Sequence, residues 1–312
     1  MSAREGGRQE SGQNGQKAAR SQVPVLPVVV AIAAGFAVAG SRGGSAVGAV
    51  PVFALCVCLA FVIQWAAFVP AFLLQTERFY DLTGSATFIT VTITAVTLAS
   101  TVDLRSVLLM VMVLLWAVRL GGYLFRRVLR AGKDTRFDAI KPSFSRFLVA
   151  WSLQGLWVTL TLGAALAAIT SDAHRSLDPL AYAGLVVWVV GFGLEVVADV
   201  QKSRFRADPA NRGAFIRTGL WAWSRHPNYL GEIVLWIGVA LVAVPVLRGW
   251  QWATIISPVF VYLLIARVSG VPLLEKSADA RWGGRDDYEA YKARTAVLIP
   301  LPRRVGGASL RG

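Results

Sequence analysis

Residues 50–74 read VPVFALCVCLAFVIQWAAFVPAFLL, a run with no charged residue. About 20 consecutive apolar residues are enough for one α-helix to cross a membrane. Comparable apolar segments recur along the chain, near residues 24–40, 50–74, 85–101, 106–125, 147–170, 180–198, 229–247 and 250–266. The sequence therefore predicts an all-α fold, a polytopic transmembrane helical bundle of seven or eight spans.

The composition supports the same class. Of the 312 residues, 55% are hydrophobic and only 16% are charged, whereas a soluble domain carries roughly 25% charged residues. This excludes a soluble enzyme, a disordered chain and a secreted disulfide scaffold. Cys56 and Cys58 lie two residues apart inside an apolar run, so on a helix they face different sides and do not form a redox pair.

The N-terminal residues leave two interpretations open. Residues 1–22 are rich in Gly, Ser, Gln and Arg and lack periodicity, which predicts a disordered tail. Residues 23–49 form an extra span and a short loop, but Ala37-Val38-Ala39 resembles a signal-peptidase site. Residues 1–39 are therefore either a cleaved signal or a retained span. Residues 50–302 form the main membrane domain, and 303–312 a basic tail.

The net charge of +14 is distributed unevenly between the loops. With the N-terminal tail inside, the predicted spans place 27 Lys and Arg residues on one side and four on the other. The positive-inside rule then predicts that both termini are cytoplasmic. If the cell is bacterial, the membrane is the inner membrane. Because topology explains the basic excess, we expect membrane lipids but no nucleic acid as partners.

Several ionisable residues fall inside or at the ends of the predicted spans. Such residues are costly in lipid and normally face a protein interior or a wet cavity. Glu195 and Asp199 are four residues apart, as are Asn228 and Glu232, so each pair shares a helical face. Together they predict a polar cavity open to the cytoplasm. The intramembrane set is Arg119, Glu195, Asp199, Glu232 and Arg267.

The stretch 215–232, FIRTGLWAWSRHPNYLGE, gathers two Arg, a His, an Asn, a Tyr and a Glu where the chain re-enters the membrane. Pro227 suits the first turn of a helix, whose N-terminal N–H groups attract anions. The chain lacks a Walker loop, an HExxH motif, a GxSxG motif and a Rossmann fingerprint. With two His residues and no suitable Cys, we expect no protein-bound metal.

The run GLWAWSRHPNYLGE, residues 219–232, resembles the signature of the steroid 5α-reductase-like membrane family, in its bacterial branch of uncharacterised proteins. The similarity covers roughly residues 50–302. The same helical core is found in isoprenylcysteine carboxyl methyltransferases. Further matching segments are residues 116–123, 136–138, 154–157, 195–205, 268–275 and 288–300.

This resemblance implies a reductase that takes hydride from NADPH and acts on a lipid or steroid-like enone. It implies that the cofactor enters from the cytoplasm and the substrate from the bilayer. The family's catalytic Gln-Glu pair is matched by Gln75-Thr76-Glu77, with one residue inserted, and its partner Tyr falls at Trp116. The acid is then either Glu77 or Asp81, with Tyr80 either beside it in the site or only an interfacial aromatic.

The cofactor site implied by the resemblance and the motif is large. Phosphates would lie at a basic mouth made by three span ends, with the nicotinamide deeper, toward Arg119. Arg119 and Tyr123 match an upstream helix that contacts the cofactor. The complete predicted set is Arg119, Tyr123, Glu195, Asp199, Arg204, Arg206, Arg225, His226, Asn228, Tyr229, Glu232, Arg267 and Glu275.

Two other function classes stay open. The first is a methyltransferase that uses S-adenosylmethionine to modify a lipid-soluble acceptor. The second is a non-enzymatic membrane protein that keeps the fold. Four arginines, Arg204, Arg206, Arg217 and Arg225, favour NADPH, because a cofactor rich in phosphate calls for arginine and a sulfonium cation does not. The sequence leaves the substrate and the oligomeric state open.

Overall fold

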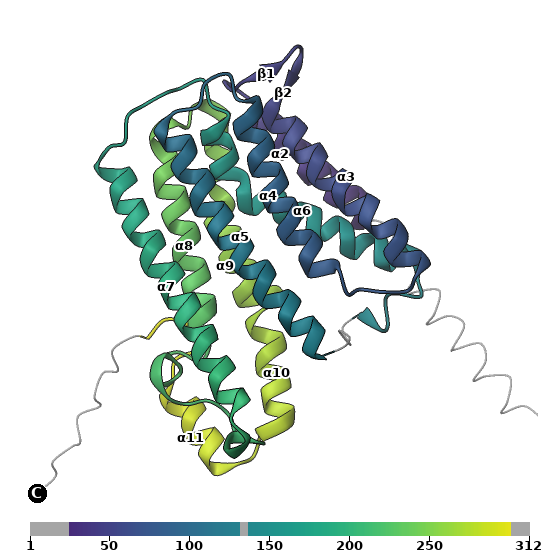
Figure 1. The fold of residues 1–312 in the computed structure, drawn as a ribbon, viewed down its shortest axis with the longest axis vertical. Helices are drawn as coiled ribbons and strands as arrows, with labels where there is room; N and C mark the ends of the chain where they lie inside the picture. The colour runs from purple at the N-terminus through teal and green to yellow at the C-terminus, as the bar shows by residue number, and fades with distance from the viewer. Residues whose placement is uncertain (1–24, 132–136, 301–312) are drawn as a thin grey trace, which may run out of the picture. The chain divides into compact units, whose positions relative to one another are not determined.

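The computed structural model describes residues 25–131 and 137–300. The tails predicted for residues 1–22 and 303–312 lie outside these described residues. Contacts divide the described chain into two compact units. The N-terminal unit contains the residues up to 183 together with 239–257, and the C-terminal unit contains 184–238 and the residues from 258 onward. Figure 1 shows the helices and strands of both units.

The N-terminal unit is built from apolar helices around a buried central helix. That helix is α6, and most of its side chains are inaccessible to solvent. Helix α3 packs against both α4 and α6, and α4 packs against α5. The helices are α2 (Val25–Gly40), α3 (Val52–Leu73), α4 (Tyr80–Leu98), α5 (Leu104–Ala131) and α6 (Phe144–Ile169).

A small hairpin joins α2 to α3. Its antiparallel strands β1 (Ala46–Val47) and β2 (Val50–Pro51) pair Val47 with Val50, leaving a two-residue turn. Gly48 in this turn has φ +60°, a conformation that glycine adopts without the steric cost of a Cβ. The run of apolar residues did not predict this hairpin, because only two residues of each strand pair.

The C-terminal unit carries the longer polar segments. Helices α7 and α8 approach closely, because a Cβ at Gly231 would lie 2.6 Å from both the backbone N of Glu195 and the carbonyl oxygen of Gly191. A π-helical turn, Leu264–Val268, follows α9 and is succeeded by α10. The helices are α7 (Pro179–Ala207), α8 (Pro227–Ala243), α9 (Ile256–Leu263), α10 (Val271–Trp282) and α11 (Asp286–Arg294), of which α7, α8 and α9 also contribute residues to the N-terminal unit.

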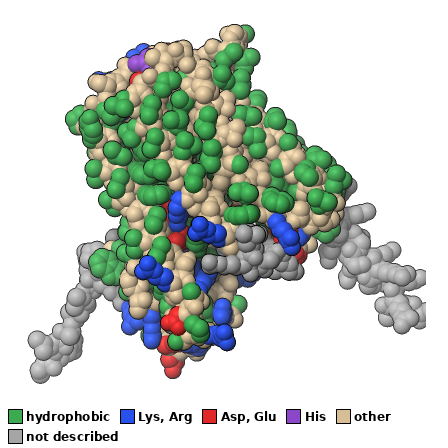
Figure 2. All heavy atoms as spheres, viewed as in Figure 1, with side chains coloured by type: hydrophobic (Ala, Val, Ile, Leu, Met, Phe, Trp, Pro, Cys, Tyr) green, Lys and Arg blue, Asp and Glu red, His purple; other side chains and the backbone are tan. Residues whose placement is uncertain are grey.

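Within the described residues, seven helical segments are long and apolar enough to cross a membrane. Apolar side chains cover much of the outer surface of the helices (Figure 2), as expected for a surface that faces lipid. The all-α polytopic prediction is confirmed, and the chain is a multi-pass membrane protein. The segments are Val52–Leu73, Tyr80–Leu98, Leu104–Arg126, Phe144–Ile169, Pro179–Ala207, Pro227–Val246 and Gly249–Trp282.

One span prediction needs correction, and the extra N-terminal span stays a prediction. The described helix Val25–Gly40 is apolar but shorter than the seven spanning segments. The last span, predicted at 250–266, belongs to a helical segment that continues to Trp282, since a π-helical turn and α10 follow α9 with only Ser269 and Gly270 between them. Residues beyond 266 are more polar, so hydropathy alone ended the helix too early.

Candidate cofactor-binding site

The 219–226 segment is held in a compact turn before α8. Gly219 has φ +61°, and a Cβ there would lie 2.6 Å from Gln201 Nε2. Gln201 Oε1 accepts a hydrogen bond from Leu220 N at 3.0 Å. Helix α8 begins at Pro227, as the sequence predicts, because a proline lacks the N–H that a first helical residue leaves unbonded.

The chain after α11 holds this turn from the other side. Arg225 N donates to Ala296 O at 2.8 Å, and Ser224 Oγ donates to Val297 O at 3.3 Å. The hydroxyl of Tyr291 donates to Trp221 O at 2.7 Å. These bonds fix the turn so that Arg225 and the residue after it point in defined directions.

Glu275 on α10 binds two side chains of the turn at once. Its Oε1 lies 2.7 Å from His226 Nε2, and its Oε2 lies 2.7 Å from Arg225 Nη1. His226 is only 5% exposed, and its ring stacks on that of Tyr229 with centroids 5.7 Å apart. The structure thus brings together four of the predicted site residues.

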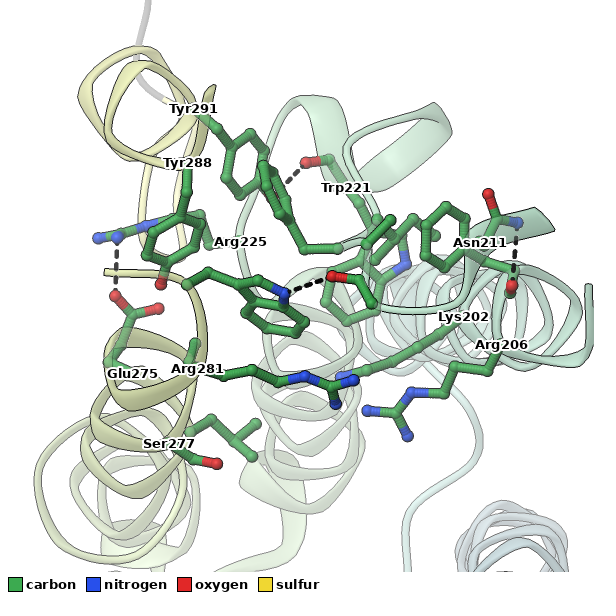
Figure 3. A pocket seen from close by; sticks show the side chains of 18 of the residues that line it. Lys202, Arg206, Asn211, Trp221, Arg225, Glu275, Ser277, Arg281, Tyr288 and Tyr291 are labelled. Atoms are coloured by element: carbon green, nitrogen blue, oxygen red, sulfur yellow. Dashed lines mark hydrogen bonds and ion pairs between the residues drawn. The ribbon is translucent and has the colours of Figure 1, made fainter. Parts of the chain in front are cut away.

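A cavity of about 360 Å³ opens beside this cluster, which is within the size range of small-molecule sites. Figure 3 shows Lys202 and Arg206 from α7 and Arg281 from α10 pointing toward the same part of the cavity. Lys202 Nζ lies 4.4 Å from the centroid of the Trp221 ring. Among the described residues, no carboxylate lies within 4.0 Å of Arg206 or Arg281. Arg206 and Arg281 therefore give the cavity positive charge that no described carboxylate within 4.0 Å neutralises.

Aromatic side chains form another wall of the cavity. Tyr288 Oη donates to Asp279 Oδ1 at 3.2 Å, and Trp282 Nε1 donates to Gly213 O at 2.8 Å. Burial raises the pKa of Tyr288 to about 12 and that of Tyr291 to about 12. Both phenols are thus neutral near pH 7, and both rings pack against Phe215. The wall comprises Phe215, Trp221, Trp282, Tyr288 and Tyr291.

A second buried polar pair lies between α7 and α8. Asn228 Nδ2 donates to Asp199 Oδ1 at 3.2 Å, which brings two predicted residues together. Glu195, one turn earlier on α7, is 3% exposed. The sequence predicted that one cavity is lined by five residues, namely Asp199, Arg206, Asn228, Glu232 and Arg267. Of these five, only Arg206 belongs to the described lining of the cavity.

The remaining predicted residues of the C-terminal unit, Arg204, Glu232 and Arg267, are not among the residues that line the cavity. Arg267 is exposed on the π-helical turn, and Glu232 is half-buried on α8. Arg204 lines a shallower hollow together with Gln201 and Thr218. Of the residues predicted to form the basic mouth, Arg206, Arg225 and His226 line the cavity, and Lys202 and Arg281 line it as well.

The candidate catalytic residues belong to the N-terminal unit. Glu77 is buried, and its Oε2 lies 2.5 Å from Lys141 Nζ. This hydrogen bond is the main cause that raises the pKa of Lys141. Tyr80 Oη donates to Ala150 O at 2.9 Å, and Asp81 lies in the first turn of α4. Their catalytic roles stay predictions.

Arg119 and Tyr123, predicted to contact the cofactor, also belong to the N-terminal unit. They lie one turn apart on α5, with the Arg119 guanidinium carbon 5.7 Å from the centroid of the Tyr123 ring. This contact orders the two side chains relative to each other. Their role toward a cofactor stays a prediction.

Sequence reasoning missed Lys202 and Arg281 as site residues. A helical signal was present for Arg281, since Glu275, Ala278, Arg281 and Trp282 recur at three- and four-residue spacing on α10 and all line the cavity. In the described part of the chain, no group of three His, Cys, Asp or Glu residues could hold a metal ion.

Comparison with known proteins places this fold in a family. Residues 67–295 match the family described as "Protein of unknown function (DUF1295)". The chain belongs to the DUF1295 family. The match contains both units' candidate residues, from Glu77 to Glu275. No solved structure matches this DUF1295 protein.

Two curated relatives are similar to this DUF1295 protein over part of their length. "Probable O-methyltransferase ustE" of Ustilaginoidea virens is 28% identical over 51% of this chain and 60% of its own length. An uncharacterized protein of Schizosaccharomyces pombe is 26% identical over 41% of this chain and 45% of its own length. The chain thus spans about half the length of these relatives.

Proposed function

We propose that this DUF1295 protein is an integral membrane reductase that binds NADPH in its C-terminal unit. Its substrate would be a lipid-soluble enone whose carbon–carbon double bond is reduced. The observation that carries the proposal is the convergence of Lys202, Arg206 and Arg281 on one cavity. NADPH carries a diphosphate and a 2′-phosphate, so several cations are needed to hold it.

The charge of the cavity supports NADPH over S-adenosylmethionine. Arginine binds phosphate through paired, charge-assisted hydrogen bonds. A sulfonium cation would instead meet positive charges of the same sign, and in a partly buried site such repulsion is screened less than in water.

The residues of this chain would have separate roles in cofactor binding and in polarising the substrate. NADPH, when bound, supplies a hydride. Arg206 and Arg281 hold and orient phosphate oxygens, and the aromatic wall excludes water. An acid must also polarise the substrate carbonyl, and Glu77 and Asp81 are the candidates. Because Lys141 holds Glu77 in an ion pair, Glu77 would need to take up a proton before donating one.

The proposal is tested by thermal unfolding of the detergent-purified protein with NADPH, NADH or S-adenosylmethionine. A ligand at 100 times its Kd stabilises by about 2.7 kcal/mol, which corresponds to a shift of about 5 °C. We expect this shift with NADPH and a smaller one with NADH. A shift with S-adenosylmethionine alone would overturn the proposal.

A methyltransferase is the second candidate. The relative named as a probable O-methyltransferase favours it. In that case the cations of the cavity would bind an acidic acceptor, such as a carboxylate, and not the cofactor. Transfer of a labelled methyl group from S-adenosylmethionine to a lipid extract would identify this activity.

A non-enzymatic membrane protein that keeps the fold is the third candidate. Glu232→Gln and Asn228→Ala would then leave both ligand binding and cell phenotype unchanged while the protein still folds. If the reductase proposal holds, at least one of these substitutions weakens NADPH binding. The two results separate a site from a packing motif.

The location is also part of the proposal. The uneven distribution of Lys and Arg between loops supports a cytoplasmic C-terminus, in the inner membrane if the host is bacterial. A cytoplasmic cofactor could then reach the basic C-terminal unit. A C-terminal reporter that is active only in the cytoplasm tests this orientation, and an inactive reporter on an expressed, folded protein would contradict it.

A further inference from the structure

The two tryptophans of the turn before α8 have opposite surroundings. Trp221 is 3% exposed, and its Nε1 donates to Ala198 O at 3.1 Å. Trp223, two residues later, is 70% exposed. An indole ring contributes a large apolar area when it is covered, so Trp223 raises the question of what covers it in the membrane.

Two further apolar side chains are exposed where the chain after α11 meets this turn. The turn pairs with that segment in parallel, and Arg225 N donates to Ala296 O at 2.8 Å. Val297 is 39% exposed and Ile299 is 58% exposed. Residues two apart in an extended chain point to the same side, so Val297 and Ile299 share one face. Exposed apolar side chains that gather in this way indicate an interaction surface.

The length of α8 places this surface relative to the membrane. The spanning segment Pro227–Val246 has 20 residues. At 1.5 Å per residue it covers about 30 Å, which is the thickness of the hydrocarbon core. Pro227 therefore lies at one boundary of the core. Trp223 comes only four residues earlier, on the side where the headgroup region begins.

Contacts with α7 keep the turn close to this boundary. Ala198 O accepts a hydrogen bond from Trp221 Nε1, and the next residue, Asp199, accepts one from Asn228. The turn and the first helical turn of α8 therefore lie at the same level of α7. Tryptophan is enriched at this level of membrane proteins, because its ring is apolar and its N–H is polar.

We propose that Trp223, Val297 and Ile299 form an interfacial anchor that docks on the headgroup region of the lipid bilayer. The partner is the bilayer, because the surface directly precedes a spanning helix and lies at its boundary. The anchored turn also carries Arg225 and His226, which line the cavity. The anchor thus holds this edge of the cavity at the level of the headgroups, whichever ligand the cavity binds.

Depth-dependent fluorescence quenching tests this placement. Cys56 is buried and Cys58 is exposed, so a Cys58→Ala background lets a thiol-reactive fluorophore report on one added position. Ile299→Cys places the label on the anchor. Asp286→Cys is the matched control, because Asp286 is an exposed residue of the same unit with a charged residue on each side. The vesicles contain phosphatidylcholine and phosphatidylglycerol, with a nitroxide either near the headgroup or deep in the acyl chain.

We expect the label at residue 299 to lose more fluorescence with the shallow nitroxide than with the deep one. The label at residue 286 should lose much less with either. Trp223→Gln should reduce the loss at residue 299, whereas Trp223→Tyr keeps an amphipathic ring and should retain it. Because Trp223 is largely exposed, both variants should unfold at the wild-type temperature in detergent. If a Trp223 variant does not fold, the comparison of residues 299 and 286 still decides the placement.

Four results would overturn the anchor. Equal quenching at residues 299 and 286 would place the surface in water, and stronger quenching by the deep nitroxide would place it inside the hydrocarbon core. Unchanged quenching in a folded Trp223→Gln protein would remove Trp223 from the anchor. Disulfide formation between two copies of Ile299→Cys, without quenching by either nitroxide, would assign the surface to a second copy of the chain.

Discussion

Glu77 in the N-terminal unit and Glu275 in the C-terminal unit are both acids in ion pairs, yet their surroundings differ. Glu77 is bound by Lys141 beside a cluster of aromatic side chains, where Tyr80 gives its hydroxyl to a backbone carbonyl. Glu275 binds Arg225 and His226 at the edge of a cavity that three further cations face. The clearest difference between the two acids is the cavity, which Glu275 lines together with Lys202, Arg206 and Arg281.

The largest effect on stability is expected at the pair in the N-terminal unit. Lys141→Met removes the Lys141 ammonium from the buried Glu77 carboxylate, and breaking a buried pair in this way costs about 3–5 kcal/mol. Chemical unfolding in detergent measures the loss. The double variant Glu77→Gln, Lys141→Met should recover much of it. NADPH affinity of the folded fraction should not change, and a large change there would contradict the contrast.

A substitution in the cavity of the C-terminal unit should lower the affinity for NADPH and leave the stability of the protein nearly unchanged. Arg281→Gln removes a cation that faces the cavity, so NADPH affinity should fall by about 1.5–3 kcal/mol, or roughly 10- to 100-fold. Stability without ligand should stay nearly constant. The control is Arg294→Gln, an exposed arginine on α11 outside the cavity lining. Equal losses in both variants would show only a general effect of charge.

The close approach of α7 and α8 gives a third test. A methyl group on Gly231 would overlap the backbone of Gly191 and Glu195, so Gly231→Ala should destabilise by about 1–3 kcal/mol. Gly193 on α7 has open space where a Cβ would lie, so Gly193→Ala should be neutral or slightly stabilising. Unfolding temperatures measure both. Equal effects would contradict the packing of these helices.

The smallest effect concerns the buried phenols. Burial raises the pKa of Tyr291 to about 12, so the folded protein holds this proton more tightly than the unfolded chain. Stability should then fall above pH 10, by at most about 1.4 kcal/mol per pH unit for each such group. Tyr291→Phe should flatten this alkaline loss, as measured by unfolding temperature between about pH 9 and 11.5. An unchanged slope would show that the phenol is not responsible.

The Lys141–Glu77 ion pair of the N-terminal unit also affects stability in this alkaline pH range. Separate variants distinguish its contribution from that of the Tyr291 phenol. The pKa of Lys141 is raised by Glu77, so its contribution to stability is complete below about pH 10 and is lost as the pH rises through the raised pKa. Lys141→Met removes this part of the alkaline loss, whereas Tyr291→Phe removes the phenol's part.

Sequence patterns predicted the helices better than the site. Long uncharged runs located the spans, and Pro227 located the start of α8, because both signals are local. The partners of Glu77 and Glu275 lie 64 and 49 residues away in the sequence, and no local pattern pairs them. The direction of Arg225 depends on a backbone bond to Ala296. Sequence reasoning therefore named four of the residues that line the cavity, Arg206, Arg225, His226 and Glu275, but not Lys202 and Arg281.

Hydrogen–deuterium exchange with and without NADPH tests the central claim most directly, because it locates ligand binding along the chain. We predict that NADPH slows exchange in residues 202–226 and 271–291, which line the cavity, and leaves residues 77–81 and 137–143 of the N-terminal unit unchanged. S-adenosylmethionine should give no such protection. Protection by S-adenosylmethionine alone, or NADPH protection confined to the N-terminal unit, would contradict the account.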